Sequence, residues 1–279
     1  MIKVNQSMKT EAEVRSSPIQ PLPIAMTVAG SDSGGGAGIQ ADLLTFCGLK
    51  VFGTSAITCL TAQNPDGVAA VEVMSPAFVL EQIKQIKKYF PLNALKTGML
   101  FDVDIIMAVV SFLQEHRKIA AVIDPVMVAT SGAELLRPNA VQAIKDKLLP
   151  LATVTTPNLD EVKVLLGKRP TDRKSMIQAA AELVNEYQSA ALVKGGHMEG
   201  EEIVDILYET DGTVTEIYCK RIKGINTHGS GCTLSAAIAA ELAKGNQLKQ
   251  AVEAAHAYLQ RGMRSPRCLQ DQSFIGHGG

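Results

Sequence analysis

The chain has 279 residues, 46% of them hydrophobic, and a formal net charge of −1 at pH 7. This length and composition predict one large α/β domain or two small ones with a full hydrophobic core. The balanced charge, and the lack of any Lys/Arg cluster interleaved with aromatic residues, argue against a nucleic-acid-binding or membrane-binding protein. No uninterrupted run of about 18 apolar residues occurs, so no spanning helix is expected.

In chain order the hydrophobic pattern switches repeatedly between the periods of strands and helices. It predicts a strand at 24–30, a helix at 37–49, strands at 52–62 and 68–74, a helix at 77–90, a strand at 94–100, a helix at 103–116, strands at 119–124 and 152–156, helices at 158–167 and 176–188, strands at 190–196, 202–209 and 213–220, and helices at 231–244 and 247–262. Such alternation is typical of a mostly parallel sheet covered by helices on both faces, with ligands beyond the carboxyl ends of the strands.

The two ends of the chain are set apart from this alternation. Residues 1–22 are polar and lack an apolar stretch of signal-peptide length, so we expect a disordered N-terminal arm. Residues 23–265 are expected to form a single domain, followed by a C-terminal tail at 266–279. The five cysteines are an odd number without a C-x-x-C pair or a histidine at ligand spacing. They indicate neither a disulfide framework nor a zinc site, which favours a reducing, cytoplasmic compartment.

A glycine-rich segment, "AGSDSGGGAGIQAD" at 29–42, joins the first predicted strand to the first predicted helix. Positions 36–41 fit the relaxed dinucleotide fingerprint G-x-G-x-x-A, but no acidic residue for a ribose occurs at 43–65. A P-loop is also excluded, because no Gly-Lys-Ser/Thr closes the glycines. Two readings stay open: a flexible turn, or a polar loop, flanked by Asp32 and Asp42, that lets a small substrate approach the backbone.

A second glycine segment, "NTHGSGCTLSAAIAAELAKG" at 226–245, runs directly into an alanine-rich helix. Residues 229–232 therefore offer unpaired N–H groups at the positive end of that helix, an arrangement that binds anions and stabilises a transferring phosphoryl group. The same field is expected to lower the pKa of the Cys232 thiol, so that it acts as a base or as an acceptor for a substrate hydroxyl. The alternative is a small, buried apolar residue.

Seven blocks occur in the order and spacing of the hydroxymethylpyrimidine kinase/phosphomethylpyrimidine kinase family: "AGSDSGGGAGIQADL", "LTAQN", "KTGML", "DPVMVATSG", "TPNLDE", "VKGGH" and "NTHGSGCTLSAAIA". The resemblance covers residues 24 to 263. It implies a ribokinase-like three-layer α/β/α sandwich with a central, mostly parallel sheet. It also implies Mg2+- and ATP-dependent phosphorylation of 4-amino-5-hydroxymethyl-2-methylpyrimidine, then of its monophosphate to the diphosphate, by a homodimer.

The same resemblance assigns the catalytic residues. Cys232 matches the cysteine of the family's anion hole, with Gly229 and Gly231 as its glycines. Ser230 stands where the family has threonine and keeps the hydroxyl.

Four further positions resemble the family's substrate contacts. Asp42 and Gln63 would bind the polar edge of the pyrimidine, since together they offer acceptors and a donor. Met99 and Val126 would supply apolar walls around the ring; the alternative for both is core packing.

The remaining matches concern phosphate and metal. Asn158 and Glu161 resemble the fold's Asn-x-x-Glu element, with Asn158 near the nucleotide and Glu161 near the magnesium, although their spacing also fits a helix capping box. Asp124 follows a strand and precedes a proline, where its carboxylate would hold magnesium directly or through water. Lys194 resembles the nucleotide-phosphate lysine.

Two other functions compete with the pyrimidine kinase. A pyridoxal kinase uses the same fold and nearly the same motifs. A non-enzymatic binding module is disfavoured, because the matched blocks keep Asp124, Glu161, Lys194 and Cys232. Residues 33–36 and His228 are candidates for accommodating the phosphate of the intermediate.

Overall fold

The computed structural model describes residues 21–127, 138–196, 198, 200–269 and 272–278. The expected N-terminal arm lies almost entirely outside the described residues, as does the end of the predicted block "DPVMVATSG".

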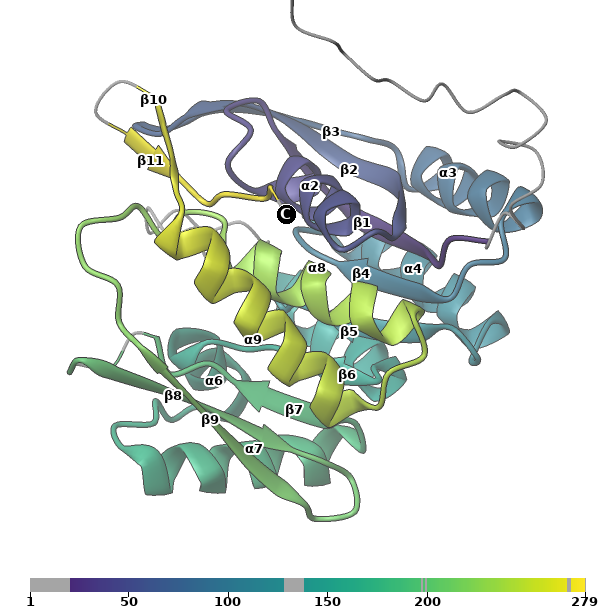
Figure 1. Cartoon of the computed structure of the whole chain (residues 1–279). Coiled ribbons are helices and arrows are strands. Elements are labelled where there is room, and N and C mark those ends of the chain that lie inside the picture. Colours follow the sequence, from purple (N-terminus) through teal and green to yellow (C-terminus); the bar gives the residue numbers. More distant parts are fainter. Residues whose placement is uncertain (1–20, 128–137, 197, 199, 270–271, 279) are drawn as a thin grey trace, which may run out of the picture.

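Nine strands of the described chain form one sheet in the order β3-β2-β1-β4-β5-β6-β7-β8-β9 (Figure 1). The strands are β1 (Ile24–Asp32), β2 (Phe52–Asn64), β3 (Gly67–Val73), β4 (Ala94–Thr97), β5 (Ala120–Ile123), β6 (Val154–Thr155), β7 (Ala190–Val193), β8 (Glu202–Tyr208) and β9 (Val214–Lys220). The pairings from β2 to β7 are parallel, whereas β3, β8 and β9 pair antiparallel at the two edges. A separate hairpin joins β10 (Arg267–Leu269) to β11 (Gln272–Phe274).

Helices cover both faces of the sheet. They are α2 (Gly38–Gly48), α3 (Pro76–Tyr89), α4 (Val103–Glu115), α5 (Pro138–Ala143), α6 (Leu159–Leu166), α7 (Arg173–Tyr187), α8 (Ser230–Ala243) and α9 (Leu248–Arg264), with short helical turns at Ile144–Leu148 and Leu149–Leu151. Helices α2, α8 and α9 share one hydrophobic cluster with the sheet, and α3, α4, α6 and α7 share the other. The predicted three-layer α/β/α sandwich is confirmed.

Local sequence explains where the elements begin. The side chains of Ser75 and Asp102 accept hydrogen bonds from backbone N–H groups in the first turns of α3 and α4. Polar N-cap residues favour the start of a helix because these N–H groups have no partner within it. The predicted strand at 94–100 ends earlier, at Thr97. The hairpin of β10 and β11 lies in the segment for which only a tail was expected.

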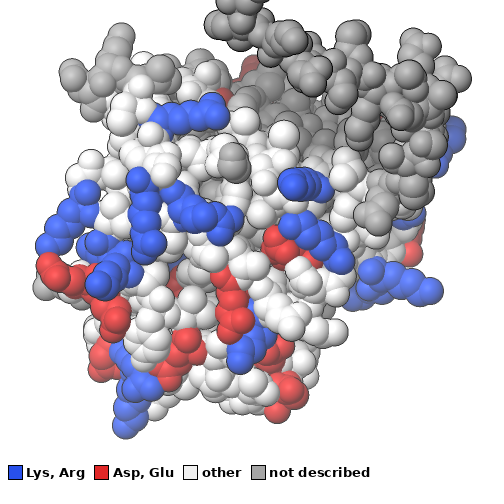
Figure 2. Space-filling model, in the orientation of Figure 1, with Lys and Arg blue, Asp and Glu red and all other residues white. Residues whose placement is uncertain are grey.

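Lys/Arg and Asp/Glu side chains are both present on the face drawn in Figure 2, with uncharged areas between them. In the part of the chain that the structure describes, no helix combines the length and apolarity needed to cross a membrane.

Candidate active site

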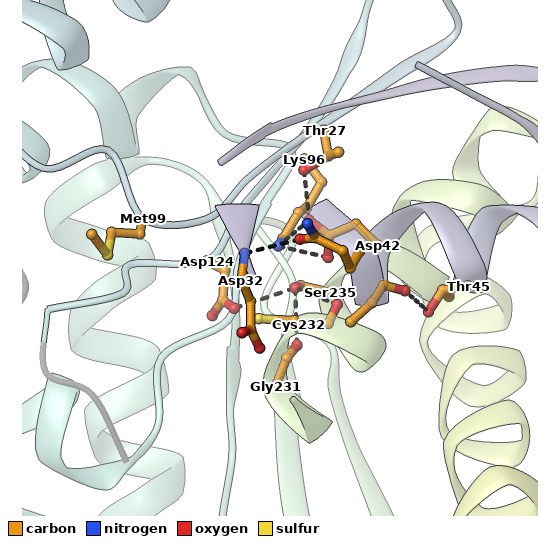
Figure 3. Close-up of polar contacts among 12 residues, drawn as sticks. Thr27, Asp32, Asp42, Thr45, Lys96, Met99, Asp124, Gly231, Cys232 and Ser235 are labelled. Atoms are coloured by element: carbon orange, nitrogen blue, oxygen red, sulfur yellow. Dashed lines mark hydrogen bonds and ion pairs between the residues drawn. The ribbon is translucent and has the colours of Figure 1, made fainter. Parts of the chain in front are cut away.

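Polar side chains gather at the carboxyl edge of the central parallel strands. Asp32 ends β1, Asp124 follows β5 and Lys194 follows β7. Helix α8 begins at the same edge, so its N-terminal turn faces these side chains (Figure 3). This is the place where ligands bind in parallel α/β sheets.

The first glycine-rich loop is organised around Asp32. One carboxylate oxygen accepts a hydrogen bond from Gly34 N–H at 2.7 Å, and the other accepts from Gly36 and Ala37 N–H at 3.1 and 2.8 Å. Burial alone would raise the pKa of Asp32, but hydrogen bonds from His228, Gly34, Ala37 and the Gln63 side chain lower it to about 2. The loop is therefore a turn fixed by an internal carboxylate.

We expect Asp32→Asn to destabilise the protein by about 2 kcal/mol at pH 7, because the lowered pKa measures how strongly the fold favours the carboxylate. A depressed folded-state pKa contributes stability that is complete above the ordinary value of 3.8 and is lost as pH falls through about 2. Urea unfolding of both proteins at neutral pH and near pH 3 measures the difference, which must shrink in acid. Asp66→Asn, at an exposed turn, is the matched control; a pH-independent difference for Asp32→Asn would contradict the prediction.

The two glycine-rich loops touch each other. Gly229 has a φ of +80°, and a Cβ on it would lie 1.9 Å from the carbonyl oxygen of Gly36. Beside this contact, His228 Nε2 lies 3.3 Å from an Asp32 carboxylate oxygen. The loop between β1 and α2 and the loop before α8 thus form one unit.

The start of α8 presents free backbone donors. The N–H of Ser230 donates to the carbonyl of Thr227, and Thr233 N–H donates to Gly229. No acceptor among the described residues takes the N–H groups of Gly231 and Cys232. Two amides at the positive end of a helix fit an anion.

Asp124 and Lys194 lie next to those amides. Lys194 Nζ is 3.1 Å from Asp124 Oδ1, which also accepts from the hydroxyl of Thr156 at 2.9 Å. Ser235 of α8 donates to Asp124 Oδ2 at 3.2 Å. A Cβ on Gly231 would lie 3.5 Å from Lys194 Nζ and 4.0 Å from Asp124 Oδ2, so the pair borders the helix N-terminus.

Charge keeps Lys194 protonated. Burial would lower its pKa, but the carboxylates of Asp124 and Glu161 outweigh burial and raise it. The ammonium group of Lys194 is thus a fixed cation at this edge of the sheet.

Asn158 and Glu161 form the capping box of α6. The Asn158 side chain accepts from the N–H groups of Asp160 and Glu161, and Glu161 Oε2 accepts from Asn158 N–H at 2.8 Å. The capping interpretation is confirmed. Burial raises the pKa of Glu161 to about 7, Lys194 opposes this and Asp124 adds to it. A metal role for Glu161 stays a prediction.

The expected pKa of Cys232 is wrong in direction. Burial raises the pKa of the thiol; the ammonium of Lys96 and the N–H of Gly38, which donates to the sulfur, offset only part of this, while Asp42 and Asp124 add to the increase. Desolvation thus outweighs the helix end, and the free enzyme holds a thiol rather than a thiolate at neutral pH.

Sequence reasoning missed Lys96. Its Nζ lies 2.9 and 2.8 Å from the two carboxylate oxygens of Asp42, and Thr27 donates to Asp42 at 2.6 Å (Figure 3). Both charged side chains have no exposed surface. Burial would lower the pKa of Lys96, but Asp42 raises it. A lone lysine in the apolar block "ALKTGML" was the available signal.

The pairing changes the prediction for Asp42. Its carboxylate is not a free acceptor in this structure, because Lys96 and Thr27 occupy both oxygens and the side chain is fully buried. Its direct contact with a substrate stays a prediction.

The other predicted substrate contacts lie at the rim of the same edge. Gln63 is half-buried, and its backbone N–H and C=O both bind the hydroxyl of Ser33. Met99 is half-buried and points away from the Lys96 cluster (Figure 3). Val126 is also half-buried, two residues after Asp124. Contact of these three side chains with the substrate stays a prediction.

The sequence and the fold both resemble vitamin kinases. A family profile described as phosphomethylpyrimidine kinase matches residues 32–277. The hydroxymethylpyrimidine/phosphomethylpyrimidine kinase of Rhizobium meliloti is 47% identical over 256 residues, which cover 91% of this chain and 94% of that protein. The enzyme of the same name from Synechococcus elongatus is 44% identical, covering 92% and 97%.

Two solved structures share the fold. An ADP complex of Bacillus subtilis pyridoxal kinase has a TM-score of 0.85 at 37% identity, covering 92% of this chain and 98% of that one. Phosphomethylpyrimidine kinase from Clostridium difficile has a TM-score of 0.76 at 36% identity, covering 85% and 98%. The profile match spans most of the chain, and the identities are high over nearly the full length of the relatives. The chain therefore belongs to the phosphomethylpyrimidine kinase family.

Proposed function

We propose that the protein uses ATP to phosphorylate 4-amino-5-hydroxymethyl-2-methylpyrimidine, and then its monophosphate, in thiamine biosynthesis. The observation that carries this proposal is the convergence of the free amides of α8, Cys232, Asp124 and Lys194 at one sheet edge. Phosphoryl transfer needs positioning and stabilisation of charge on the transferred oxygens, which fixed donors of this kind provide. The named functions of the relatives agree with it.

Each residue has a distinct part in the transfer. The amides of Gly231 and Cys232, with Gly229 and Ser230 shaping the turn, hold the oxygens of the moving phosphoryl group. Lys194 binds the nucleotide phosphates, and Asn158 fixes the start of α6 beside it. In the first step the thiolate form of Cys232, which the raised pKa makes a minor form at neutral pH, takes the proton of the substrate hydroxyl.

Asp124 and Glu161 fit a magnesium ion. They are buried carboxylates, Lys194 Nζ lies 3.1 Å from Asp124, and burial together with Asp124 raises the pKa of Glu161. The described residues contain no set of three His, Cys, Asp or Glu that would enclose a metal. Mg2+ keeps water and phosphate ligands beside one or two carboxylates. Bound there, it would offset the negative charge of the ATP phosphates.

The substrate that accepts the phosphoryl group binds on the side of the Gly231 and Cys232 amides that faces away from ATP. Gln63 offers a donor and an acceptor to the aminopyrimidine, Met99 and Val126 border the ring, and Asp42 acts with Lys96 beneath it. We also propose that the protein works in a reducing cytoplasm, which its five free cysteines favour, and that it forms a homodimer.

The second candidate is a pyridoxal kinase. It is favoured by the higher TM-score to the pyridoxal kinase of Bacillus subtilis than to the phosphomethylpyrimidine kinase of Clostridium difficile. Pyridoxal also carries a hydroxymethyl group on a substituted ring.

The test is coupled ADP release with ATP and Mg2+, run in parallel on the hydroxymethylpyrimidine, its monophosphate and pyridoxal. Turnover of both pyrimidines is the expected result. Turnover of pyridoxal alone would keep the fold and the phosphate site but would remove Gln63 and Met99 as pyrimidine-selective contacts.

A further inference from the structure

The C-terminal segment 272–278 contacts both glycine-rich loops. Strand β11 belongs to the hairpin that lies beside the loop between β1 and α2 (Figure 1). The Ser273 hydroxyl oxygen accepts a hydrogen bond from the backbone N–H of Asn226 at 2.9 Å. Two atoms of the Phe274 ring lie 3.4 Å from the position of a Cβ on Gly36. Neighbouring residues of one short strand thus reach two loops that are far apart in sequence.

The residues after β11 anchor the segment. Ile275 is 5% exposed and belongs to the hydrophobic cluster of α8 and α9. Gly276 N–H donates to the carbonyl of Gly262 at 3.0 Å. A Cβ on Gly276 would lie 2.2 Å from the carbonyl oxygen of Ser265, so only glycine allows this approach.

His277 continues the anchor onto α2. Its Nδ1 lies 3.3 Å from the hydroxyl of Thr45 on α2 and 3.3 Å from the hydroxyl of Tyr258 on α9. A Cβ on Gly48 would lie 2.6 Å from the His277 carbonyl oxygen. His277 therefore contacts α2 and α9 at the same time, and both helices are packed against the sheet. This anchor holds β11 at a fixed place over the two glycine-rich loops.

A chain of hydrogen bonds runs from Ser273 into the site. Asn226, held by Ser273, accepts with its side chain from His228 N–H at 2.9 Å. His228 Nε2 reaches Asp32, the carboxylate that binds the first glycine-rich loop. The next residue after His228 is Gly229, which touches Gly36.

We propose that Ser273 is a positioning residue for phosphoryl transfer. It sets Asn226, and through it the turn at Gly229, against the Gly36 loop, while Phe274 supports that loop from the side. The inference rests on the proposed kinase function for its kinetic readout. Displacement of the turn moves the amides of Gly231 and Cys232 away from the transferred group.

Ser273→Ala removes the acceptor of Asn226 N–H. We expect kcat for both pyrimidine steps to fall about fivefold to tenfold, because the displaced amides of Gly231 and Cys232 lose roughly the free energy of one hydrogen bond to the transferred group in the transition state. KM for ATP stays unchanged, because the hydrogen bonds that start at Ser273 lead through Asn226 and His228 to Asp32, whereas Lys194 is bound to Asp124. Ser273→Thr keeps a hydroxyl at this position and suits an extended strand, so its kcat is expected to equal that of wild type. Gln272→Ala, on the same strand and exposed, is the control and stays at the wild-type rate.

A purely structural role would lower the free energy of unfolding in urea without changing kcat of the folded protein, and this outcome overturns the proposal. A kcat of Ser273→Thr as low as that of Ser273→Ala also overturns the proposal.

A second measurement does not depend on turnover. Hydrogen exchange of a peptide spanning 226–232 is expected to be faster in Ser273→Ala than in wild type and in Gln272→Ala. If wild type turns over none of the three acceptors but the exchange difference is present, the proposed function fails and the positioning role stands. Unchanged exchange overturns the positioning role.

Discussion

Replacing Cys232 by alanine is expected to slow the first phosphorylation about 10²- to 10⁴-fold, the usual contribution of a general base, and to slow the second far less. The first acceptor is an alcohol that must lose its proton, whereas the phosphate of the second is already anionic near neutral pH. The thiol lies in the first turn of α8 beside Gly38 N–H and the Lys96 ammonium. Separate assays of the two steps measure the effect.

The raised pKa of Cys232 adds a pH signature. A base whose pKa lies above its ordinary value is mostly protonated at neutral pH, so kcat of the first step should rise as pH increases toward that pKa. Cys232→Ala should lose this rise, and the second step should lack it in wild type. Cys219→Ala, which removes a thiol from β9 at the sheet edge, is the matched control. Equal losses in both steps would count against a base role.

The order of the predicted strands and helices, read from the period of the hydrophobic residues, was enough to predict a sheet with helices on both faces. The apolar run at Ile24–Asp32 and the helix after it follow from local spacing, and so do the caps at Asp102 and Asn158. These features depend on residues a few positions apart, for which sequence period and propensity are informative.

The features that the sequence did not predict depend on contacts between segments that are far apart in the chain. Lys96 and Asp42 are 54 positions apart, Ser273 and Asn226 are 47 apart, and His228 and Asp32 are 196 apart. No local pattern signals such pairs, so the buried ion pair and the contacts of the tail emerge only from the fold. The error for Cys232 has the same origin, because desolvation depends on everything packed around the thiol.

The contact between the two glycine-rich loops gives the second large effect. We expect Gly229→Ala to lower the rates of both phosphorylations by about 10²-fold, the cost of misplacing reacting groups by about 1 Å. The new Cβ would lie 1.9 Å from the carbonyl oxygen of Gly36, so the loops must separate before the methyl group fits. The amides of Gly231 and Cys232 would move with the turn, and the proposed mechanism uses them in both steps.

The backbone conformation of Gly229 must be separated from this clash. Gly245 has a φ of +90° and nothing within 4 Å of its Cβ position, so Gly245→Ala introduces left-handed strain alone. We expect Gly245→Ala to cost about 1 kcal/mol of stability in urea and to leave both rates unchanged. If Gly229→Ala behaves in the same way, with lower stability and full activity, then close contact between the loops does not position the transferred phosphoryl group. Loss of both rates in Gly229→Ala alone assigns the effect to the approach of Gly229 to Gly36, which joins the N-terminal turn of α8 to the loop held by Asp32.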